Sequence, residues 1–386
     1  MRHFGHIPPA VRESLFFREP CEFDADSPAD VLSAALGATL YSPATRPRLA
    51  DDVVKQAGLG VVSMVLCLED SIDDAEVVGA EANLVRQFAD LAERADDIPL
   101  LFVRVREPEQ ISDLTRRLGS SVRLLSGFVL PKFTEERGEL FLEALTAAEA
   151  VAGRRLFAMP VLESPELLHL ETRSDTLRGI ARTVDKYRDR ILALRLGVTD
   201  FCSAYGLRRA PDMTAYDVQI VGAVIGDVVN MLGRSDGTGF TITGPVWEYF
   251  RLQERMFKPQ LRRSPFAGQA EDLRTTLIEH DLDGLLREIE LDRANGLLGK
   301  TCIHPSHVLP VHALSVVSHE EYSDAQDILR PERGGGGVLR SAYTNKMNEV
   351  KPHRAWAERT LRRAEVFGVA REDIGFVELL AAGVTD

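Results

Sequence analysis

The sequence predicts an α/β fold, a (β/α)8 TIM barrel, on the strength of three observations. Eight short apolar runs recur along the chain, each run ends in polar or turn residues, and segments with helical periodicity lie between the runs. Apolar runs separated by helices are typical of parallel strands that are buried on both faces. Eight is the strand count of the barrel, although a doubly wound open sheet would share the alternation of strands and helices.

The strands and helices follow one another in a regular order. The eight expected strands are residues 38–41, 61–68, 100–105, 127–130, 156–162, 191–196, 240–242 and 299–303. The expected helices are residues 51–57, 76–94, 135–152, part of 166–190, 216–232 and 281–295. Ser164, Pro165 and Glu166 match the N-cap, the first helical position and the first-turn acid of a helix. Glu163 is therefore expected at the end of the preceding strand.

The 386 residues exceed the roughly 250 that a plain barrel needs, so we expect additions to it. An N-terminal extension is expected over residues 1–36, the catalytic barrel over 37–330 and a helical tail over 338–386. The four glycines at 334–337 would form a flexible hinge before the tail. Residues 247–272, rich in Arg, Gln and Phe, are expected to form an extra helix or a cap over the barrel.

Charge and composition exclude several classes of protein. With 46 Lys and Arg against 59 Asp and Glu, the net charge is −13, which argues against broad nucleic-acid binding but leaves small anions possible. We find no export signal, and no apolar stretch approaches the roughly 18 residues of a membrane span. The four cysteines are far apart and form no C-x-x-C pair. We therefore expect a cytoplasmic protein with reduced thiols and no nucleic-acid or membrane partner.

Polar residues that directly follow an apolar run are the candidates for a site, because the active site of a parallel barrel lies at the C-terminal ends of its strands. Four carboxylates stand in such positions: Glu69, Asp70, Glu163 and Asp200. Carboxylates packed together raise one another's pKa unless a cation neutralises them, and all-oxygen ligation suits Mg²⁺. Alternatively, Glu69 and Asp70 cap the next helix or pair with Arg46 and Arg104. As a set, the four favour a metal site.

Two other kinds of chemistry are less well supported. Cys302, His304 and His307 have a spacing that suggests zinc, but no fourth ligand is apparent and a strand would point its alternate side chains to opposite faces. Lys132 could suggest a Schiff-base aldolase, which needs an uncharged amine. A mouth rich in carboxylates would keep Lys132 protonated, so we expect a salt-bridge partner there instead.

Seven short motifs occur in order between about residue 38 and about residue 330. They are YSPATRP at 41–47, LEDSI at 68–72, VRV at 103–105, VLPK at 129–132, LES at 162–164, GVTD at 197–200 and GKTCIHP at 299–305. This series resembles the citrate lyase β-subunit family, which is grouped with the HpcH/HpaI aldolases and malyl-CoA lyases. Residues 343–353 resemble the tail of the barrel lyases found in tellurium-resistance and stress gene clusters.

The resemblance implies a Mg²⁺-dependent carbon–carbon lyase and a role for each candidate residue. Glu163 and Asp200 would be the metal ligands, and Glu69 and Asp70 would hold metal-bound waters. Arg104 would act with this catalytic set and, together with Arg46 and Lys132, would bind the substrate. These roles agree with chemistry, since a 2-oxo acid chelates Mg²⁺ through its carboxylate and carbonyl oxygens and arginine binds carboxylates in bidentate fashion.

The tail carries one more candidate. Related lyases take an acid/base carboxylate from a Lys-Met-Ile-Asp-like run of the C-terminal segment, often from a neighbouring subunit. Here the matching run is Lys-Met-Asn-Glu at 346–349, so Glu349 is a candidate general acid/base. It could equally be a first-turn acid of a solvated helix. Because barrels of this family are commonly trimers or hexamers, we expect a homo-oligomer.

The sequence thus predicts a lyase that cleaves or condenses a small 2-oxo-acid-derived or acyl-CoA-type substrate through an enolate. The substrate, the use of CoA and the direction of the reaction stay open, since the additions could cover the mouth. One alternative is a phosphoenolpyruvate-type mutase or phosphotransfer barrel, for which only Arg46, Arg104 and Arg106 offer basic groups. The other is a non-catalytic barrel that serves assembly or regulation, which the intact Glu163 and Asp200 speak against.

Overall fold

A computed structural model describes residues 1–94, 97–250, 282–330 and 336–383. Its main sheet has eight strands in the order β8-β7-β6-β5-β4-β3-β2-β9, and all neighbouring strands are parallel. The strands are β2 (Ala38–Pro43), β3 (Ser63–Cys67), β4 (Leu100–Arg104), β5 (Leu125–Leu130), β6 (Phe157–Leu162), β7 (Leu194–Leu196), β8 (Ile242–Thr243) and β9 (Lys300–Cys302). The predicted (β/α)8 barrel is confirmed, and each expected strand overlaps an observed one.

The barrel closes between β8 and β9, where Gly244 forms a parallel bridge with Lys300. The Gly244 nitrogen donates to the Gly299 oxygen at 2.9 Å, and the Thr301 nitrogen donates to the Gly244 oxygen at 3.1 Å. A side chain at position 244 would place its Cβ 2.3 Å from a carboxylate oxygen of Asp292, which leaves room only for glycine. The sheet is therefore a closed ring rather than an open one.

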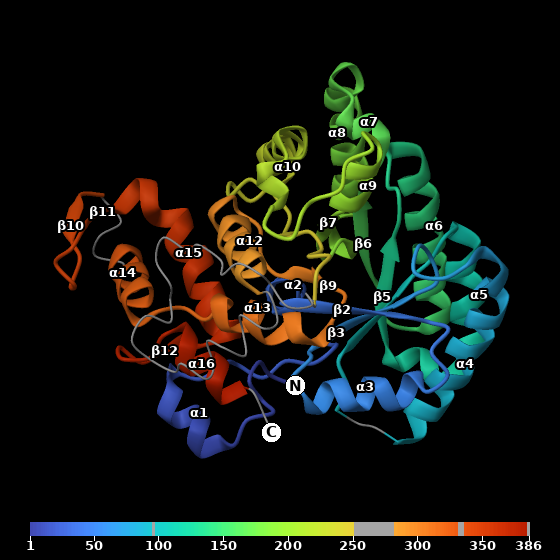
Figure 1. Ribbon diagram of the computed structural model, residues 1–386, viewed down its shortest axis with the longest axis horizontal. Coiled ribbons are helices and arrows are strands. Elements are labelled where there is room, and N and C mark those ends of the chain that lie inside the picture. Colours follow the sequence, from blue (N-terminus) through green and yellow to red (C-terminus); the bar gives the residue numbers. More distant parts are fainter. Residues whose placement is uncertain (95–96, 251–281, 331–335, 384–386) are drawn as a thin grey trace.

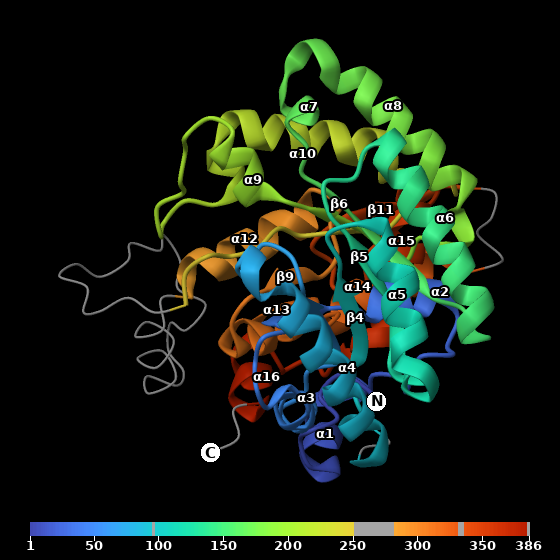
Figure 2. The same cartoon turned by 90° about the vertical axis from the view of Figure 1, so that its right-hand side faces the viewer.

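Helices surround this ring, as Figures 1 and 2 show. The helices of the barrel are α3 (Leu49–Gly58), α4 (Val77–Arg94), α5 (Pro108–Leu118), α6 (Glu135–Ala152), α7 (Pro165–Leu168), α8 (Leu170–Lys186), α9 (Val198–Ser203), α10 (Gln219–Leu232), α12 (Asp283–Ala294) and α13 (Val308–Ser315). Helix α5 is not among the helices expected from the sequence. This helix has a Glu107–Gln110 capping box and a first-turn proline, and it buries Ile111, Leu114, Thr115 and Leu118.

Alternate residues of the strands divide into two apolar clusters. One cluster contains the outward-facing residues, such as Leu66 and Val103, and packs them against the helices. The other contains the inward-facing ones, such as Val65, Phe102 and Met159. This alternation follows from the two-residue repeat of a strand. Arg104 is two residues after the inward-facing Phe102 on β4, so its side chain also points toward the barrel axis, at the C-terminal end of the strand.

The two ends of the chain join beside the barrel. The N-terminal segment forms α1 (Pro9–Leu15), β1 (Phe16–Arg18) and α2 (Ala29–Ala35). The C-terminal segment forms α14 (His319–Leu329), β10 (Val338–Arg340), β11 (Met347–Glu349), α15 (Val350–Phe367), β12 (Val369–Ala370) and α16 (Phe376–Gly383). Strand β1 pairs antiparallel with β12, and Phe367 of α15 joins Phe23 and Leu32 in the inward-facing cluster. The C-terminal helix thus packs against the same core as the N-terminal segment.

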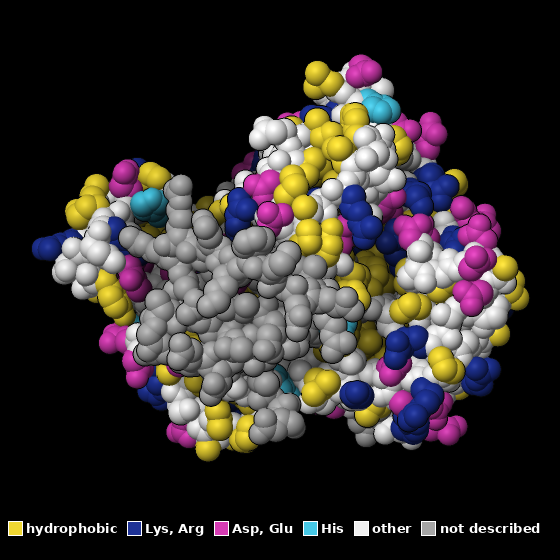
Figure 3. Space-filling model, in the orientation of Figure 1, with side chains coloured by type: hydrophobic (Ala, Val, Ile, Leu, Met, Phe, Trp, Pro, Cys, Tyr) yellow, Lys and Arg dark blue, Asp and Glu magenta, His cyan; other side chains and the backbone are white. Residues whose placement is uncertain are grey.

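The expected cap and hinge are only partly observed. Residues 251–272 of the cap and 334–335 of the hinge lie outside the described residues. The boundaries at 36, 37, 330 and 338 remain our proposal for the domain organisation. No helix within the described ranges is long and apolar enough to span a membrane. On the face drawn in Figure 3, acidic and basic side chains lie interspersed over the helices at the right.

Buried histidines make the stability of this core depend on pH. Burial lowers the pKa of His3 from 6.5 to about 3, where its ring stacks on Phe367 at 4.2 Å. A histidine whose folded pKa is depressed contributes stability above pH 6.5, and that contribution is lost as the pH falls toward the folded pKa. We expect His3→Gln to reduce the pH slope of the unfolding free energy between pH 6 and 4.5 by about 1.4 kcal/mol per pH unit. Urea unfolding of both proteins at several pH values measures it, and equal slopes would contradict it.

Candidate active site

Charged side chains from the ends of five strands, β3 to β7, meet at the C-terminal mouth of the barrel. Arg104 is the last residue of β4, and its Nη2 lies 2.6 Å from Glu69 Oε2, 3.0 Å from Glu163 Oε1 and 3.1 Å from Asp70 Oδ2. Glu69 and Asp70 follow β3, and Glu163 follows β6. A single guanidinium therefore joins three of the four carboxylates that the sequence singled out.

Lys132, which follows β5, is the second cation of the cluster. Its Nζ lies 2.6 Å from Glu69 Oε1 and 3.4 Å from Asp70 Oδ1, and its backbone nitrogen donates to Glu163 Oε1 at 2.9 Å. Partial burial opposes the charge of this amine, but the hydrogen bond from Lys132 to Glu69 raises its pKa above the ordinary value. Lys132 thus acts as a protonated salt-bridge partner and not as the uncharged amine that Schiff-base chemistry needs.

Asp200 completes the set from the first turn of α9. The pKa of Asp200 is raised, first by burial and then by the negative charge of Asp70. Burial also raises the pKa of Glu163 to about 7, and the charge of Asp200 adds to the effect although Arg104 opposes it. Gly197 leaves the space for this carboxylate, because a Cβ there would lie 2.3 Å from the Cβ of Glu163. Glu163 and Asp200 are therefore neighbours at the mouth, where the charge of Asp200 raises the pKa of Glu163 and a hydrogen bond with Glu163 opposes the rise for Asp200.

The donor set fits a magnesium ion. Four carboxylates meet two cations in this cluster, so two negative charges are left over. Burial raises the pKa of Glu163 and of Asp200 most, neighbouring carboxylates raise it further, and a divalent cation would offset both effects. The described ranges contain no group of three or more His, Cys, Asp or Glu side chains arranged to hold a metal. Mg²⁺ is commonly held by only one or two carboxylates, with water and substrate as its other ligands.

Two predicted site residues do not reach this cluster. Arg46 lies in the loop after β2, is exposed, and donates from Nε to Asp52 Oδ2 at 2.5 Å. Glu349 is the last residue of β11 and is exposed, and its backbone nitrogen donates to His353 Nδ1. In Figure 1 the β10–β11 hairpin lies at the left edge, far from α9, which carries Asp200. Within one chain, Glu349 is therefore remote from the mouth.

Arg106 is a supporting residue to which the sequence analysis gave no role in a lyase. Its Nε donates to the Leu68 oxygen at 2.7 Å, and its Nη2 donates to the Ile72 oxygen at 3.1 Å. These bonds hold the loop that carries Glu69 and Asp70. The sequence did contain a signal for this role. Arg106 is two residues after Arg104, and residues two apart along an extended strand lie on the same face.

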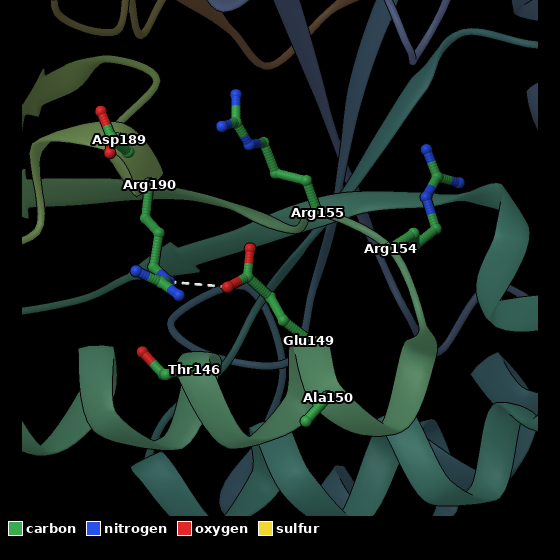
Figure 4. A pocket seen from close by; sticks show the side chains of 7 residues that line it. All are labelled: Thr146, Glu149, Ala150, Arg154, Arg155, Asp189 and Arg190. Carbon is green, nitrogen blue, oxygen red and sulfur yellow. Dashed lines mark hydrogen bonds and ion pairs between the residues drawn. The ribbon is translucent and has the colours of Figure 1, made fainter.

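A cavity of about 520 Å³ lies at the opposite end of the strands, as drawn in Figure 4. It is lined by Thr146, Glu149, Ala150, Arg154, Arg155, Asp189 and Arg190. Arg190 donates from Nε to Glu149 Oε2 at 2.6 Å. Because Arg155 precedes β6 and Arg190 precedes β7, this cavity is separate from the charged cluster. The candidate active site remains the cluster at the C-terminal mouth.

Comparison with protein families gives one match that spans most of the chain. The model of a carbon–carbon bond lyase family of the TIM-barrel fold matches residues 30–369. The comparison with curated proteins gave no match. The matched range includes the whole barrel and all residues of the charged cluster.

Solved structures similar to this chain include a citrate lyase, a CitE protein and a malate synthase. A citrate lyase from Burkholderia xenovorans LB400 is 16% identical with a TM-score of 0.62, and the match covers 94% of this chain and 100% of that one. CitE from Mycobacterium tuberculosis, in complex with magnesium, acetoacetate and coenzyme A, is 20% identical with a TM-score of 0.52, covering 86% and 99%. Malate synthase from Haloferax volcanii, with magnesium and glyoxylate, is 14% identical with a TM-score of 0.50, covering 71% and 73%. At these identities the likeness supports the shared fold.

Proposed function

The chain belongs to the carbon–carbon bond lyase family of the TIM-barrel fold, and on that premise we propose that it is a Mg²⁺-dependent lyase acting on a 2-oxo-acid-derived substrate through an enolate. One observation carries the proposal: the buried carboxylate of Glu163 has Asp200 as its neighbour at the mouth, and Arg104 Nη2 lies 3.0 Å from Glu163 Oε1. Two adjacent carboxylates favour a divalent cation, and a neighbouring guanidinium favours an anionic substrate. The arrangement suits a substrate that is both a chelator and a carboxylate.

Each residue then has a role in the proposed reaction. Glu163 and Asp200 would hold the ion, which when bound supplies the positive charge that polarises the carbonyl of an oxo acid. Glu69 and Asp70 would accept hydrogen bonds from water at the ion. Arg104 would bind the substrate carboxylate, with Lys132 keeping Glu69 in place. Arg46 would have to leave Asp52 before it could contact the same substrate.

Glu349 would act from a neighbouring subunit of a homo-oligomer. The β10–β11 hairpin that carries it stands out from the barrel in Figure 1, and its Met347 is 56% exposed. An exposed hairpin can enter the mouth of a second copy, which would bring an acid/base carboxylate to the charged cluster. The trimer or hexamer expected from the sequence provides such a neighbour.

The named complexes of the similar structures support the substrate class. CitE is in complex with magnesium, acetoacetate and coenzyme A, and malate synthase is in complex with magnesium and glyoxylate. For this chain we propose a small 2-oxo acid as one partner of the reaction and an acyl-CoA-type molecule as a candidate for the other. In condensation the acyl-CoA-type molecule would supply the enolate carbon, and the oxo acid would supply the carbonyl carbon to which the new bond forms.

Calorimetry tests the proposal. We expect Mg²⁺ to bind the protein, and glyoxylate, pyruvate or oxaloacetate to bind at least about tenfold more tightly when Mg²⁺ is present, because chelation adds interactions to the carboxylate contact. Ca²⁺ is a useful comparison, since it prefers more ligands and longer bonds. Absence of Mg²⁺ binding, or Mg²⁺ binding with no effect on oxo-acid affinity, would rule the lyase out.

A further inference from the structure

Tyr41 lies in the barrel interior one inward-facing row below Arg104, since Tyr41 pairs with Val65 and Val65 with Phe102, and neither the family motif nor the cluster assigns it a role. It belongs to β2 and packs against the inward-facing apolar residues of the barrel. The positive charges of Arg195 and Arg104 and the negative charge of Glu163 are near enough to act on its phenol. Tyr41 is partly exposed, and its hydroxyl makes no hydrogen bond with another residue in the described ranges. A phenolic hydroxyl thus stands free at the floor of the mouth.

Arg195 lies beneath this phenol and has an unusual environment. Its side chain is 1% exposed, and its Cζ lies 5.4 Å from the centre of the Tyr41 ring. Its partners are neutral: Thr301 Oγ1 at 2.7 Å, Thr39 Oγ1 at 3.4 Å and Met159 Sδ at 3.6 Å. Within the described part of the chain no carboxylate lies at ion-pair distance, and Nε has no partner. Burying a cation without a counter-ion costs free energy, so we expect Arg195 to have a role that compensates for this cost.

The hydroxyl of Tyr41 without a partner and the buried Arg195 without a counter-ion are explained together if the phenol carries negative charge during the reaction. Burial raises the pKa of Tyr41, while the charges of Arg195 and Arg104 oppose that rise. The resting group is therefore a neutral phenol with a proton to give. After the proton has left, the positive charges of Arg195 and Arg104 would stabilise the oxygen anion, and Arg195 would then have a counter-ion.

We propose that Tyr41 is the general acid that protonates the enolate, with Arg195 as the positioning residue beneath it; this inference rests on the proposed function. In the cleavage direction, the electron pair of the enolate carbon–carbon double bond forms a new C–H bond to the phenolic proton, and the carbonyl is restored. The O–H pair stays on the Tyr41 oxygen as a phenolate, which water then reprotonates. In condensation the phenolate removes the same proton. Glu349 of a neighbour would then be left to handle the hydroxyl proton.

Hydrogen exchange isolates this step from the rest of the reaction. The methyl groups of pyruvate and of acetyl-CoA are the probes, each followed by proton NMR in D₂O with Mg²⁺, and acetyl-CoA is measured with and without pyruvate. We expect the wild type to exchange at least one probe and Tyr41→Phe to lower that rate by at least about 100-fold. Mg²⁺ affinity and the melting temperature should be retained, because the lost hydroxyl makes no described hydrogen bond. Arg195→Met should also slow exchange, and Arg195→Lys should recover part of the rate.

Matched variants make each outcome decisive. Tyr187→Phe is the control, since Tyr187 precedes β7 at the opposite end of the strands. Wild-type exchange in Tyr41→Phe would overturn the proposal, as would loss of Mg²⁺ binding in that variant, which would give Tyr41 a structural role. Loss of exchange in Glu349→Gln but not in Tyr41→Phe would assign the acid to Glu349. If Mg²⁺ promotes oxo-acid binding but Tyr41→Phe exchanges hydrogen as fast as the wild type, only this inference fails. If Mg²⁺ does not promote oxo-acid binding, the proposed function fails as well.

Discussion

Replacing Glu163 with glutamine is expected to lower turnover by at least about 1,000-fold and to weaken Mg²⁺ binding by at least about 100-fold. The substitution keeps the shape of the side chain but removes its charge, and an amide is a poor ligand for Mg²⁺. The amide oxygen can still accept from the Lys132 nitrogen, which the carboxylate does at 2.9 Å. Arg104 keeps its 2.6 Å contact with Glu69, so the barrel mouth should remain folded.

Steady-state kinetics and calorimetry of the same preparation separate these two losses. Glu135→Gln is the matched control, because Glu135 is half-buried and pairs with Arg182 on the outside of the barrel. That variant should retain both turnover and Mg²⁺ affinity. A Glu163→Gln protein with wild-type Mg²⁺ affinity would remove Glu163 from the metal site and leave Asp200 without its proposed partner.

Replacing Lys300 with methionine is expected to destabilise the protein by about 3–5 kcal/mol. Lys300 is 1% exposed, and its Nζ lies 2.8 Å from Glu288 Oε1 and 2.7 Å from Asp292 Oδ2. Glu288 keeps Arg209 at 2.7 Å and Asp292 keeps the Tyr216 hydroxyl at 2.9 Å, but one negative charge loses its cation inside the protein. The loss falls at the seam where β9 meets β8, so it weakens the closure of the ring.

Urea unfolding of the variant and of Lys186→Met measures this effect. Lys186 forms an exposed ion pair with Glu139, and such pairs contribute about 0–1 kcal/mol. The contrast between the two lysines is therefore the informative quantity. Equal stabilities of the two variants would contradict this prediction, because they would mean that a packed methionine stabilises the protein as much as the buried ion pairs of Lys300 do. Mg²⁺ binding by the folded Lys300→Met protein should be unchanged, because Lys300 faces the helices rather than the mouth.

The sequence was informative about the barrel because parallel strands buried on both faces must be continuously apolar. All eight expected strands were found, with boundaries that differ by a few residues. Helix α5 was not among the expected helices, although its buried residues Ile111, Leu114, Thr115 and Leu118 have the i, i+3, i+4, i+7 spacing of a helix face. Its capping box and first-turn proline were the local signals that could have revealed it.

The candidate site divides along similar lines. Glu69, Asp70, Glu163 and Lys132 lie at the mouth as expected from their positions directly after strands. The reason is that all parallel strands of a closed ring end at the same mouth. Arg46 also follows a strand, but the loop carries it outward, where Asp52 binds it. Distance along the chain says nothing about the direction in which a loop turns, so Arg46 and Arg104 looked alike in the sequence.

By itself, then, the sequence determined the strand count, the mouth and the acidic residues around it, since these depend on periodicity and on the identity of residues at strand ends. The tertiary structure decided which charges meet. Arg104 binds Glu69 and Glu163, Lys300 is neutralised by two residues of α12, and Arg195 lies beneath Tyr41 with only neutral partners. The physical reason is ring closure: it brings β2, β7 and β9 together across the barrel interior, and no local pattern along the chain encodes that approach.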